Sequence, residues 1–161
     1  SDTKADLVTA FTVSYVQEAI GMVRAARAVN MPIVMGFTVE TDGKLPSGQS
    51  IGDAIAAVDE ATHHYVAYYM INCAHPTHFQ DALCSTEPWV KRIHAIRANA
   101  SCKSHAELDA APELDDGDPD ELAKQYQQLK TALPNLNVLG GCCGTDERHI
   151  EKICRLLKNS S

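Results

Sequence analysis

Long apolar runs and basic residues are both scarce in this sequence. No stretch approaches the ~20 consecutive apolar residues that a membrane-spanning helix needs, so no membrane partner is expected. Lys and Arg together number 14 against 21 Asp and Glu, which gives a formal net charge of −7, and no basic patch stands out. A nucleic-acid partner is not expected either, because nucleic acids are bound through clustered positive charge. The sequence therefore gives no support to a membrane-spanning or a nucleic-acid-binding protein.

The six cysteines do not form an obvious disulfide set. Neighbouring cysteines such as Cys142 and Cys143 seldom bridge each other, and 161 residues are enough to bury a core without disulfides. Reduced thiols are typical of a cytoplasmic protein, which is the location we expect. Cys84, Cys102 and Cys154 lie outside any motif, and we expect them to be small buried apolar residues.

Apolar runs of about six residues alternate with helical patterns along the whole chain. This alternation predicts an α/β protein that is built from βα units around a parallel sheet. Strands are expected at residues 5–11, 33–39, 66–72, 93–99 and 137–141. Helices are expected to begin near Ser14, Ser50, Thr77, Asp118 and Asp146.

Three of these helix starts carry capping signals. Ser14-x-x-Gln17 resembles a capping box, and Ser50 precedes an apolar helical stripe. Asp118 is followed by a proline and then by Glu121, which combines a cap, a first-turn proline and a capping-box glutamate. The residues expected to face the core from the last helix are Ile150, Ile153, Cys154 and Leu157.

Residues 101–117 form a long polar and acidic stretch between the fourth strand and the next helix. The stretch contains Pro112 and the pair Asp115-Asp116, and it shows no clear apolar period. We expect a flexible loop there, and its length makes a functional loop or lid plausible.

The sequence Gly-Gly-Cys-Cys-Gly-Thr at 140–145 is the most informative motif of the chain. Successive side chains of a strand point to opposite faces, so Cys142 and Cys143 can face one point only if the backbone turns there. The flanking glycines permit such a turn. Cys73 ends another strand-like run. Three thiolates that converge from two strand ends leave the fourth position of a tetrahedral zinc open, which is the arrangement of catalytic sites.

The pairing of an Ile-Asn-Cys strand end at 71–73 with the later Gly-Gly-Cys-Cys-Gly-Thr motif resembles the homocysteine S-methyltransferase family. The resemblance implies a zinc enzyme on a (β/α)8 barrel. A complete barrel needs ~250 residues, so residues 1–161 are expected to be a C-terminal fragment of one barrel domain, about strands 4 to 8. Cys73 then ends strand six and Cys142-Cys143 end strand eight, at the barrel face where such enzymes hold their chemistry.

The resemblance also implies a reaction. Cys73, Cys142 and Cys143 would bind Zn²⁺, which deprotonates a coordinating thiol. The bound thiolate of homocysteine would then take a methyl group from a donor and give methionine. The expected partners are a small-molecule thiol acceptor and a methyl donor, and the donors used in the wider superfamily include S-methylmethionine, S-adenosylmethionine, betaine and a folate.

Four further residues are judged against the family pattern. Asn72 either anchors its strand end beside the metal, where it would bind substrate, or caps a turn. Asn99 aligns with an asparagine that the family places at the end of strand seven, but the flanking proline and glycine of that pattern are absent, so Asn99 either faces substrate or shapes the loop. Phe11 stands where the family usually has a glutamate that binds the homocysteine amino group. An aromatic ring can offer an ammonium only a cation–π contact. Glu40 is either a differently placed acid or a polar loop residue.

Three alternatives remain open at this stage. His75 or His78, just after Cys73, could complete a closed structural zinc site. The chain could also be a zinc-binding or sensor module without methyl transfer, which Phe11 favours. Finally, a chain without strands one to three should expose two sheet edges, so it could be a structural fragment that assembles with another copy or another chain.

Overall fold

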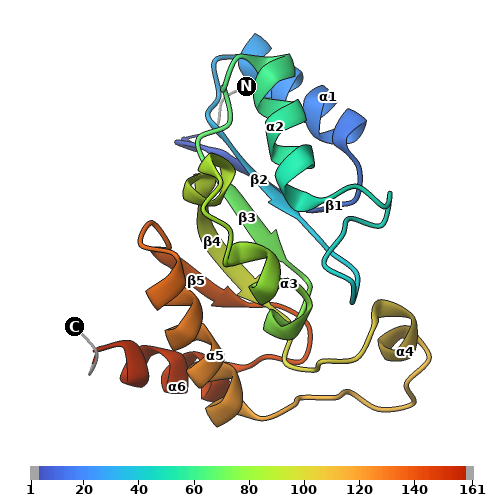
Figure 1. Ribbon diagram of the computed structural model, residues 1–161, viewed down its shortest axis with the longest axis vertical. Coiled ribbons are helices and arrows are strands. Elements are labelled where there is room, and N and C mark those ends of the chain that lie inside the picture. Colours follow the sequence, from blue (N-terminus) through green and yellow to red (C-terminus); the bar gives the residue numbers. More distant parts are fainter. Residues whose placement is uncertain (1–3, 159–161) are drawn as a thin grey trace.

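Five parallel strands lie side by side in chain order in the computed structural model, which describes residues 4–158 (Figure 1). The elements are β1 (Val8–Val13), α1 (Val16–Ala28), β2 (Ile33–Phe37), α2 (Ile51–Thr62), β3 (Tyr69–Asn72), α3 (Pro76–Leu83), the 3₁₀-helix η1 (Pro88–Arg92), β4 (Ile93–Ala98), α4 (His105–Asp109), α5 (Pro119–Ala132), β5 (Val138–Gly141) and α6 (Glu147–Lys158). Each strand is parallel to its neighbours and is followed by a helix. The predicted α/β arrangement is therefore confirmed. No helix within residues 4–158 is long and apolar enough to cross a membrane.

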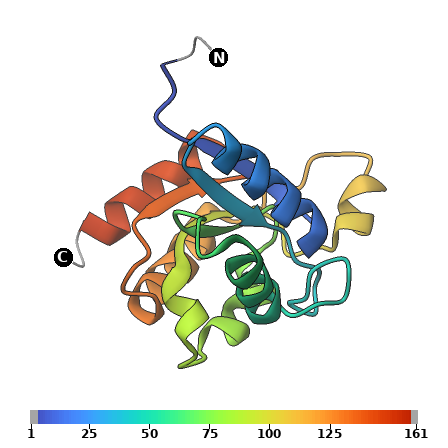
Figure 2. The same cartoon turned by 90° about the horizontal axis from the view of Figure 1, so that it is seen from above.

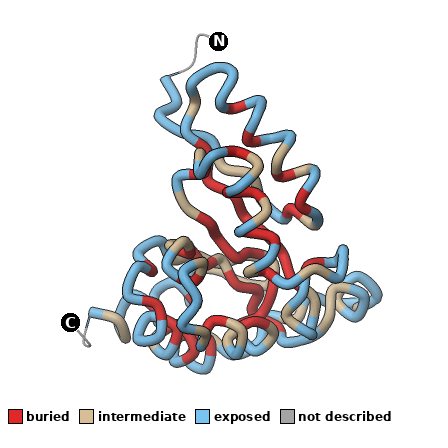
Figure 3. Tube along the Cα trace, turned by 45° about the horizontal axis from the view of Figure 1, so that its top comes forward, coloured by how far each residue is buried: buried red, intermediate tan, exposed pale blue. Residues whose placement is uncertain are grey.

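The core lies between the sheet and the helices, and Figure 3 shows the buried stretches running along the strands and the inward sides of the helices. Every residue of β2 and β3 is buried, as expected for central parallel strands. The opposite face of the sheet carries a much smaller apolar cluster, formed by Val34, Met70 and Ala95. We call this second face the inner face.

The cap signals at Ser50 and Asp118 are confirmed. The Ser50 hydroxyl accepts a hydrogen bond from the Asp53 backbone N–H, and the Asp118 carboxylate accepts from the backbone N–H groups of the two residues after Pro119. The capping box predicted at Ser14 is wrong. Strand β1 continues to Val13, so the cap position falls on Tyr15, which makes no side-chain cap bond.

The prediction for the inner side of α6 is wrong for two of its four residues. Ile153 is buried and Leu157 is partly buried against the core, whereas Ile150 and Cys154 are exposed. The buried stripe instead runs through His149, one helical turn before Ile153. A histidine is tolerated there because its Nε2 lies 2.8 Å from the Asp116 carbonyl oxygen, which satisfies the buried ring.

The three cysteines expected to be buried are all exposed. Cys84 is the C-cap of α3, Cys102 lies on the segment that leaves β4, and Cys154 is on the outer side of α6. The prediction of burial is therefore wrong for all three. It used only the general tendency of cysteine to be buried, and that tendency does not say on which side of a helix or segment a residue lies.

Residues 101–117 are not a loop throughout, because they contain α4. Ser104 and Glu107 form a capping box, with the Ser104 hydroxyl accepting from the Glu107 N–H and the Glu107 carboxylate accepting from the Ser104 N–H. The rest of the segment is tied back by Asp115, whose carboxylate accepts from the Ser101 hydroxyl at 3.0 Å. Figures 1 and 2 both show α4 projecting to one side of the strands.

The sheet is open within the described residues. Its edge strands are β1 and β5, each paired with a single neighbour. Apolar side chains on these edges, including Val8, Phe11 and Val138, are exposed. The two exposed edges expected from the sequence are therefore present, and self-association through them stays a prediction.

Candidate metal centre

Three cysteine sulfur atoms meet at the carboxyl ends of two strands. Cys73 follows β3 directly, and Cys142 and Cys143 follow β5. All three sulfur atoms lie within 4.8 Å of one another, and the sulfur atoms of Cys73 and Cys143 are 3.6 Å apart. Within residues 4–158 this is the only group of three or more metal-ligating side chains that is so closely spaced. The structure therefore brings together the three cysteines that the sequence motifs singled out.

Backbone hydrogen bonds to β4 fix both cysteine segments. The Cys73 N–H donates to the Arg97 carbonyl at 3.1 Å, and the Cys142 N–H donates to the Ala98 carbonyl at 2.8 Å. Strand β4 lies between β3 and β5 in the sheet. The two segments are thus bonded to consecutive residues of the same strand, which sets the distance between their sulfur atoms.

The glycines of the motif leave room for a local turn. A Cβ on Gly141 would lie 2.1 Å from the Thr145 hydroxyl oxygen, which no real side chain could accept. Thr145 uses that hydroxyl and its backbone N–H to donate to the Cys142 carbonyl, at 2.7 and 3.1 Å. Gly144 has a φ of 78°, in the left-handed region that favours glycine. Thr145 was part of the motif, but its role as a clamp on Cys142 appears only in the structure.

Asn99 is almost fully buried and contacts the second cysteine. Its Oδ1 accepts from the Cys143 N–H at 3.2 Å, and the next residue, Ala100, donates its N–H to the Cys143 carbonyl at 2.9 Å. The Asn99 side chain also lines the cleft beside the sulfur atoms. No described residue accepts a hydrogen bond from its Nδ2, so this donor is available to a ligand in the cleft.

Asn72 uses its amide group within the protein. Its Oδ1 accepts from the Thr12 N–H at 2.9 Å and its Nδ2 donates to the Thr12 hydroxyl at 2.7 Å. The amide passes over Gly36, where a Cβ would lie 2.7 Å from the Asn72 Oδ1. These bonds join the ends of β1 and β3 across β2, as the anchoring reading of Asn72 requires. Contact of Asn72 with a substrate stays a prediction.

Sequence reasoning missed His105. This residue of α4 brings its Nε2 to 2.6 Å from the Cys73 carbonyl oxygen, and its Nδ1 lies 3.4 Å from a carboxylate oxygen of Glu40. Glu40 thus lies in the loop after β2, as the polar-loop alternative predicts, and its contact with His105 links that loop to α4. No local pattern marks His105, because its partner lies 32 residues earlier in the chain.

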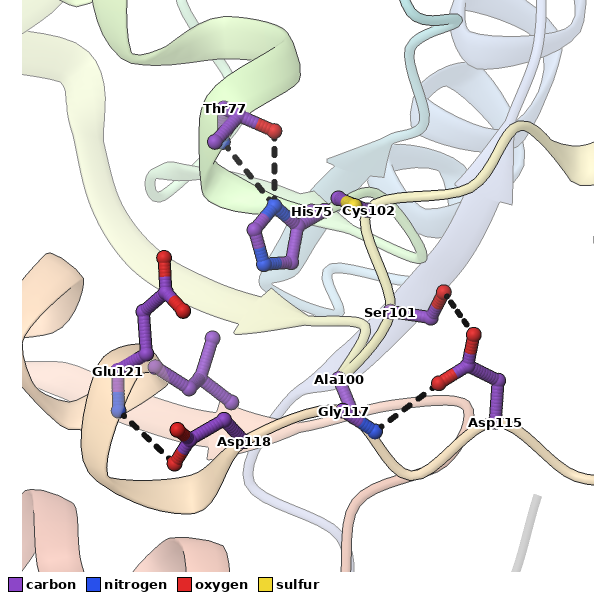
Figure 4. Close-up of a pocket in the computed structure, with 10 residues that line it drawn as sticks. His75, Thr77, Ala100, Ser101, Cys102, Asp115, Gly117, Asp118 and Glu121 are labelled. Carbon is purple, nitrogen blue, oxygen red and sulfur yellow. Dashed lines mark hydrogen bonds between the residues drawn. The ribbon is translucent and has the colours of Figure 1, made fainter.

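The two histidines that follow Cys73 do not join the sulfur cluster. His75 caps α3, with its Nδ1 accepting from the Thr77 N–H, and His78 places its Nε2 at 2.9 Å from the Cys102 carbonyl oxygen. The ring of His75 faces a separate small pocket of ≈ 210 Å³, which Glu121 also lines (Figure 4). Burial and the neighbouring His78 lower the pKa of His75 to about 4, so the ring is neutral at pH 7. No histidine among residues 4–158 completes a closed four-ligand site with the cysteines.

A cleft of ≈ 450 Å³ opens beside the cluster. Cys73 and Cys143 line it, and so do His105, Leu108 and Asp109 of α4. The remaining wall comes from the ends of the first two strands and the loop after β2, namely Thr12, Ser14, Thr38 and Pro46. A ligand bound to the sulfur cluster would therefore lie next to the α4 segment.

The three thiols hydrogen-bond to one another, and these bonds shift their pKa values. The Cys73 thiol donates toward the Cys142 sulfur, and this bond, with those from Cys143 and the charge of Arg97, lowers the pKa of Cys142 to about 5. The same contacts and burial raise the pKa of Cys73. One thiolate is thus favoured and further thiolates are opposed by its charge. A divalent, borderline-soft ion such as Zn²⁺ suits this donor set, because it neutralises the accumulated negative charge.

A family model, curated relatives and solved structures match this chain. The family model described as homocysteine S-methyltransferase matches residues 1–157. Methionine synthase of Mycobacterium leprae (strain TN) is 29% identical over 133 residues, 82% of this chain and 10% of that protein. Methionine synthase of Mycobacterium tuberculosis (strain ATCC 25618 / H37Rv) is 29% identical over 139 residues, 86% of this chain and 11% of that protein.

Two solved structures of the homocysteine methyltransferase MmuM from Escherichia coli have the same fold. The apo form gives a TM-score of 0.69 at 19% identity, over 95% of this chain and 51% of that one. The metallated form gives 0.68 at 19% identity, over 94% and 46%. The chain therefore spans about half of these barrels and about a tenth of the curated relatives, which confirms the prediction of part of a (β/α)8 barrel.

Proposed function

Because the chain belongs to the homocysteine S-methyltransferase family, we propose that it carries the metal-binding part of a zinc-dependent S-methyltransferase. The methyl group would pass to the thiol of homocysteine and give methionine. The observation that supports this proposal above all others is the cluster of three sulfur atoms within 4.8 Å of one another beside an open cleft. Zinc bound there would keep an acceptor thiol deprotonated at neutral pH.

Each site residue has a proposed part in this reaction. Cys73, Cys142 and Cys143 hold the metal, and Asn99 donates from its Nδ2 to a substrate in the cleft. Asn72 is proposed to bind substrate at the strand end that its bonds to Thr12 hold in place. In the transfer itself the acceptor sulfur forms a bond to the methyl carbon, and the bond between that carbon and the donor breaks, with its electron pair leaving on the donor.

The catalytic unit is proposed to be larger than this chain. We propose that residues 1–161 supply the C-terminal part of a single barrel domain, and that methyl-donor contacts come mainly from the other part. The isolated chain should then bind metal but transfer methyl groups poorly or not at all. A cytoplasmic location is proposed as well, because thiolate ligands need a reducing compartment.

Phe11 favours one rival function. The ring lies where an acid was expected, and its face is occupied by the Arg97 guanidinium, whose carbon is 5.0 Å from the ring centroid. The rival is a zinc-binding or sensor module without methyl transfer. Methylation of homocysteine by the longer protein that contains this chain would reject the sensor module, and its absence would favour it.

Metal content is the first test of the proposal. We expect about one zinc per purified, reduced chain by elemental analysis, and much less in Cys142→Ser and Cys143→Ser. The matched control is Cys102→Ser, which removes an exposed thiol outside the cluster and should leave zinc content unchanged. A folded, reduced wild-type chain that takes up no zinc, or equal losses in all three variants, would contradict the thiolate site.

A further inference from the structure

Arg97 places a positive charge on the inner face of the sheet, close to the cysteine cluster. The residue belongs to β4, which also supplies the carbonyl groups that fix Cys73 and Cys142. Its side chain crosses Gly140 of β5, where a Cβ would lie 3.2 Å from the Arg97 Cγ. The absence of a side chain at Gly140 thus lets the arginine extend along the inner face.

Two contacts hold the Arg97 head group in one orientation. Its Nε donates to the Gly141 carbonyl at 3.1 Å. Its guanidinium carbon lies 5.0 Å from the centroid of the Phe11 ring, within the range of a cation–π contact. A guanidinium has five N–H donors, and only the Nε donor is used by residues 4–158. The terminal nitrogens are therefore positioned but unsatisfied by protein.

No carboxylate of the described residues forms an ion pair with Arg97. Eight other basic residues within residues 4–158 do lie within ion-pair distance of a carboxylate, namely His64, Arg92, Lys103, His105, Arg148, His149, Lys152 and Arg155. Arg97 is moreover only partly exposed. Among the described residues the charge of Arg97 acts on the Cys142 sulfur and not on a carboxylate. A partly buried guanidinium without a carboxylate partner attracts an anionic ligand to the same place. The aromatic neighbour at Phe11 adds no negative group to satisfy it.

Arg97 also lies close to the cleft that opens beside the cluster. Gly141, which accepts its Nε bond, immediately precedes Cys142, and Phe11 immediately precedes Thr12 of the cleft wall. Neither Arg97 nor Phe11 is among the residues that line the cleft, so the guanidinium lies next to the cleft wall. A short ligand with sulfur at the metal and an anionic group at its other end would extend from the cluster toward Arg97.

Resting on the proposed function, we propose that Arg97 binds a carboxylate of the acceptor, so that this site selects thiols that carry a carboxylate and does not require an amino group. Planar guanidinium groups bind carboxylates through paired hydrogen bonds, which gives orientation as well as attraction. Phe11 supports the guanidinium from one face and offers no acid for an ammonium. Arg97 is then a specificity-determining residue, whereas the metal ligands hold the sulfur.

Two ligands that each retain half of homocysteine's polar groups test this proposal. 4-Mercaptobutyrate keeps the carboxylate and lacks the amino group, and 3-mercaptopropylamine does the reverse. Both are titrated into the reduced chain loaded with Co²⁺, and binding is followed through the visible absorption of the cobalt–thiolate centre. We expect the acid to bind the wild-type chain at least about tenfold more tightly than the amine, as one well-placed charge-assisted contact provides.

The variants separate Arg97 from general charge effects. Arg97→Gln should lose about tenfold for 4-mercaptobutyrate and leave 3-mercaptopropylamine unchanged or tighter. Arg97→Lys should retain part of the preference. The control Arg24→Gln removes an exposed arginine of α1 and should change neither affinity. Circular dichroism of each variant reports folding, and if Arg97→Gln does not fold, the wild-type and Arg97→Lys comparisons decide.

The possible results distinguish this inference from the proposed function. Cobalt binding with equal affinities for the two ligands, or with the amine preferred, overturns the role of Arg97 and leaves the metal site standing. An unchanged ratio in a folded Arg97→Gln chain does the same. A reduced, folded wild-type chain that binds no cobalt overturns the metal site, and the role of Arg97 falls with it.

Discussion

Replacing Tyr126 by phenylalanine should destabilise the chain far more than the loss of one hydroxyl usually does. Tyr126 is a fully buried residue of α5, and its hydroxyl lies between the ends of two neighbouring strands. It accepts from the Ala98 N–H at 2.9 Å and donates to the Gly140 carbonyl at 2.5 Å. Removal of the oxygen leaves a backbone donor and a backbone acceptor without partners in the core.

The size of the effect follows from those two groups. Each buried backbone group that loses its partner costs about 1–3 kcal/mol, and closer approach of β4 and β5 would recover part of this. We therefore expect Tyr126→Phe to lower the free energy of unfolding by about 2–4 kcal/mol. At this chain length such a loss corresponds to a fall in Tm of roughly 4–16 °C.

Urea denaturation of the metal-free, reduced chain measures this loss directly, with the slope of the transition as a check on two-state behaviour. The matched control is Tyr65→Phe. The Tyr65 hydroxyl donates to the Met31 carbonyl at 3.2 Å in a half-buried position, so we expect a loss of no more than about 1 kcal/mol. If Tyr126→Phe stays within about 0.5 kcal/mol of the wild type, or loses no more than Tyr65→Phe, then the hydroxyl does not hold the strand ends as argued.

Three further predictions concern the ion pair between Asp59 of α2 and Arg92 of η1, the glycine before the cysteine pair, and the cysteine cluster itself. Asp59→Asn should lower the free energy of unfolding, measured by urea denaturation, by about 2–4 kcal/mol. The buried Asp59 carboxylate accepts two hydrogen bonds from Arg92, at 2.9 and 3.0 Å, and the substitution removes the counter-ion of that arginine. An unchanged urea midpoint would contradict this prediction. Gly141→Ala should lower the free energy of unfolding by about 1–3 kcal/mol and reduce the metal content, because the new Cβ would displace Thr145. Full metal content in this variant would show that the turn relaxes around the Cβ and would contradict the prediction. In the metal-free chain Cys142 should be alkylated by iodoacetamide at pH 6.5 before the other cysteines. Its pKa is lowered to about 5, so its thiolate is present at pH 6.5 and is lost only as the pH falls to about 5. Peptide mass spectrometry that finds another cysteine labelled first would contradict this prediction.

Local signals account for what the sequence predicted well. The alternation of apolar runs with helical stripes depends on side-chain period alone, and the caps at Ser50 and Asp118 depend on contacts within three residues. The cysteine cluster was predictable for a related reason. Parallel strands end at one edge of a sheet, so Cys73 and Cys142 had to come close once both were placed at strand ends.

Contacts between distant parts of the chain account for what was missed. The bond from His105 to the Cys73 carbonyl and the cation–π contact of Arg97 with Phe11 join elements that no sequence window contains together. The burial of His149 was missed because apolar periodicity gives no weight to a polar residue, although both of its ring nitrogens find partners. Helix α4 is different, because its capping box was legible in the sequence and was outweighed by the polarity of the surrounding segment.

The backbone angle of Cys73 has an evolutionary consequence. Its φ is 59°, a left-handed conformation that costs a residue with a Cβ roughly 1–2 kcal/mol and costs glycine nothing. Selection for folding alone would therefore place glycine at position 73, and Cys73→Gly should unfold at higher urea than Cys73→Ala although neither retains the thiol. We infer that selection for metal binding keeps a cysteine at this position although its left-handed backbone conformation favours glycine. In a descendant chain released from metal binding, we expect mutational drift to replace Cys73 with glycine early.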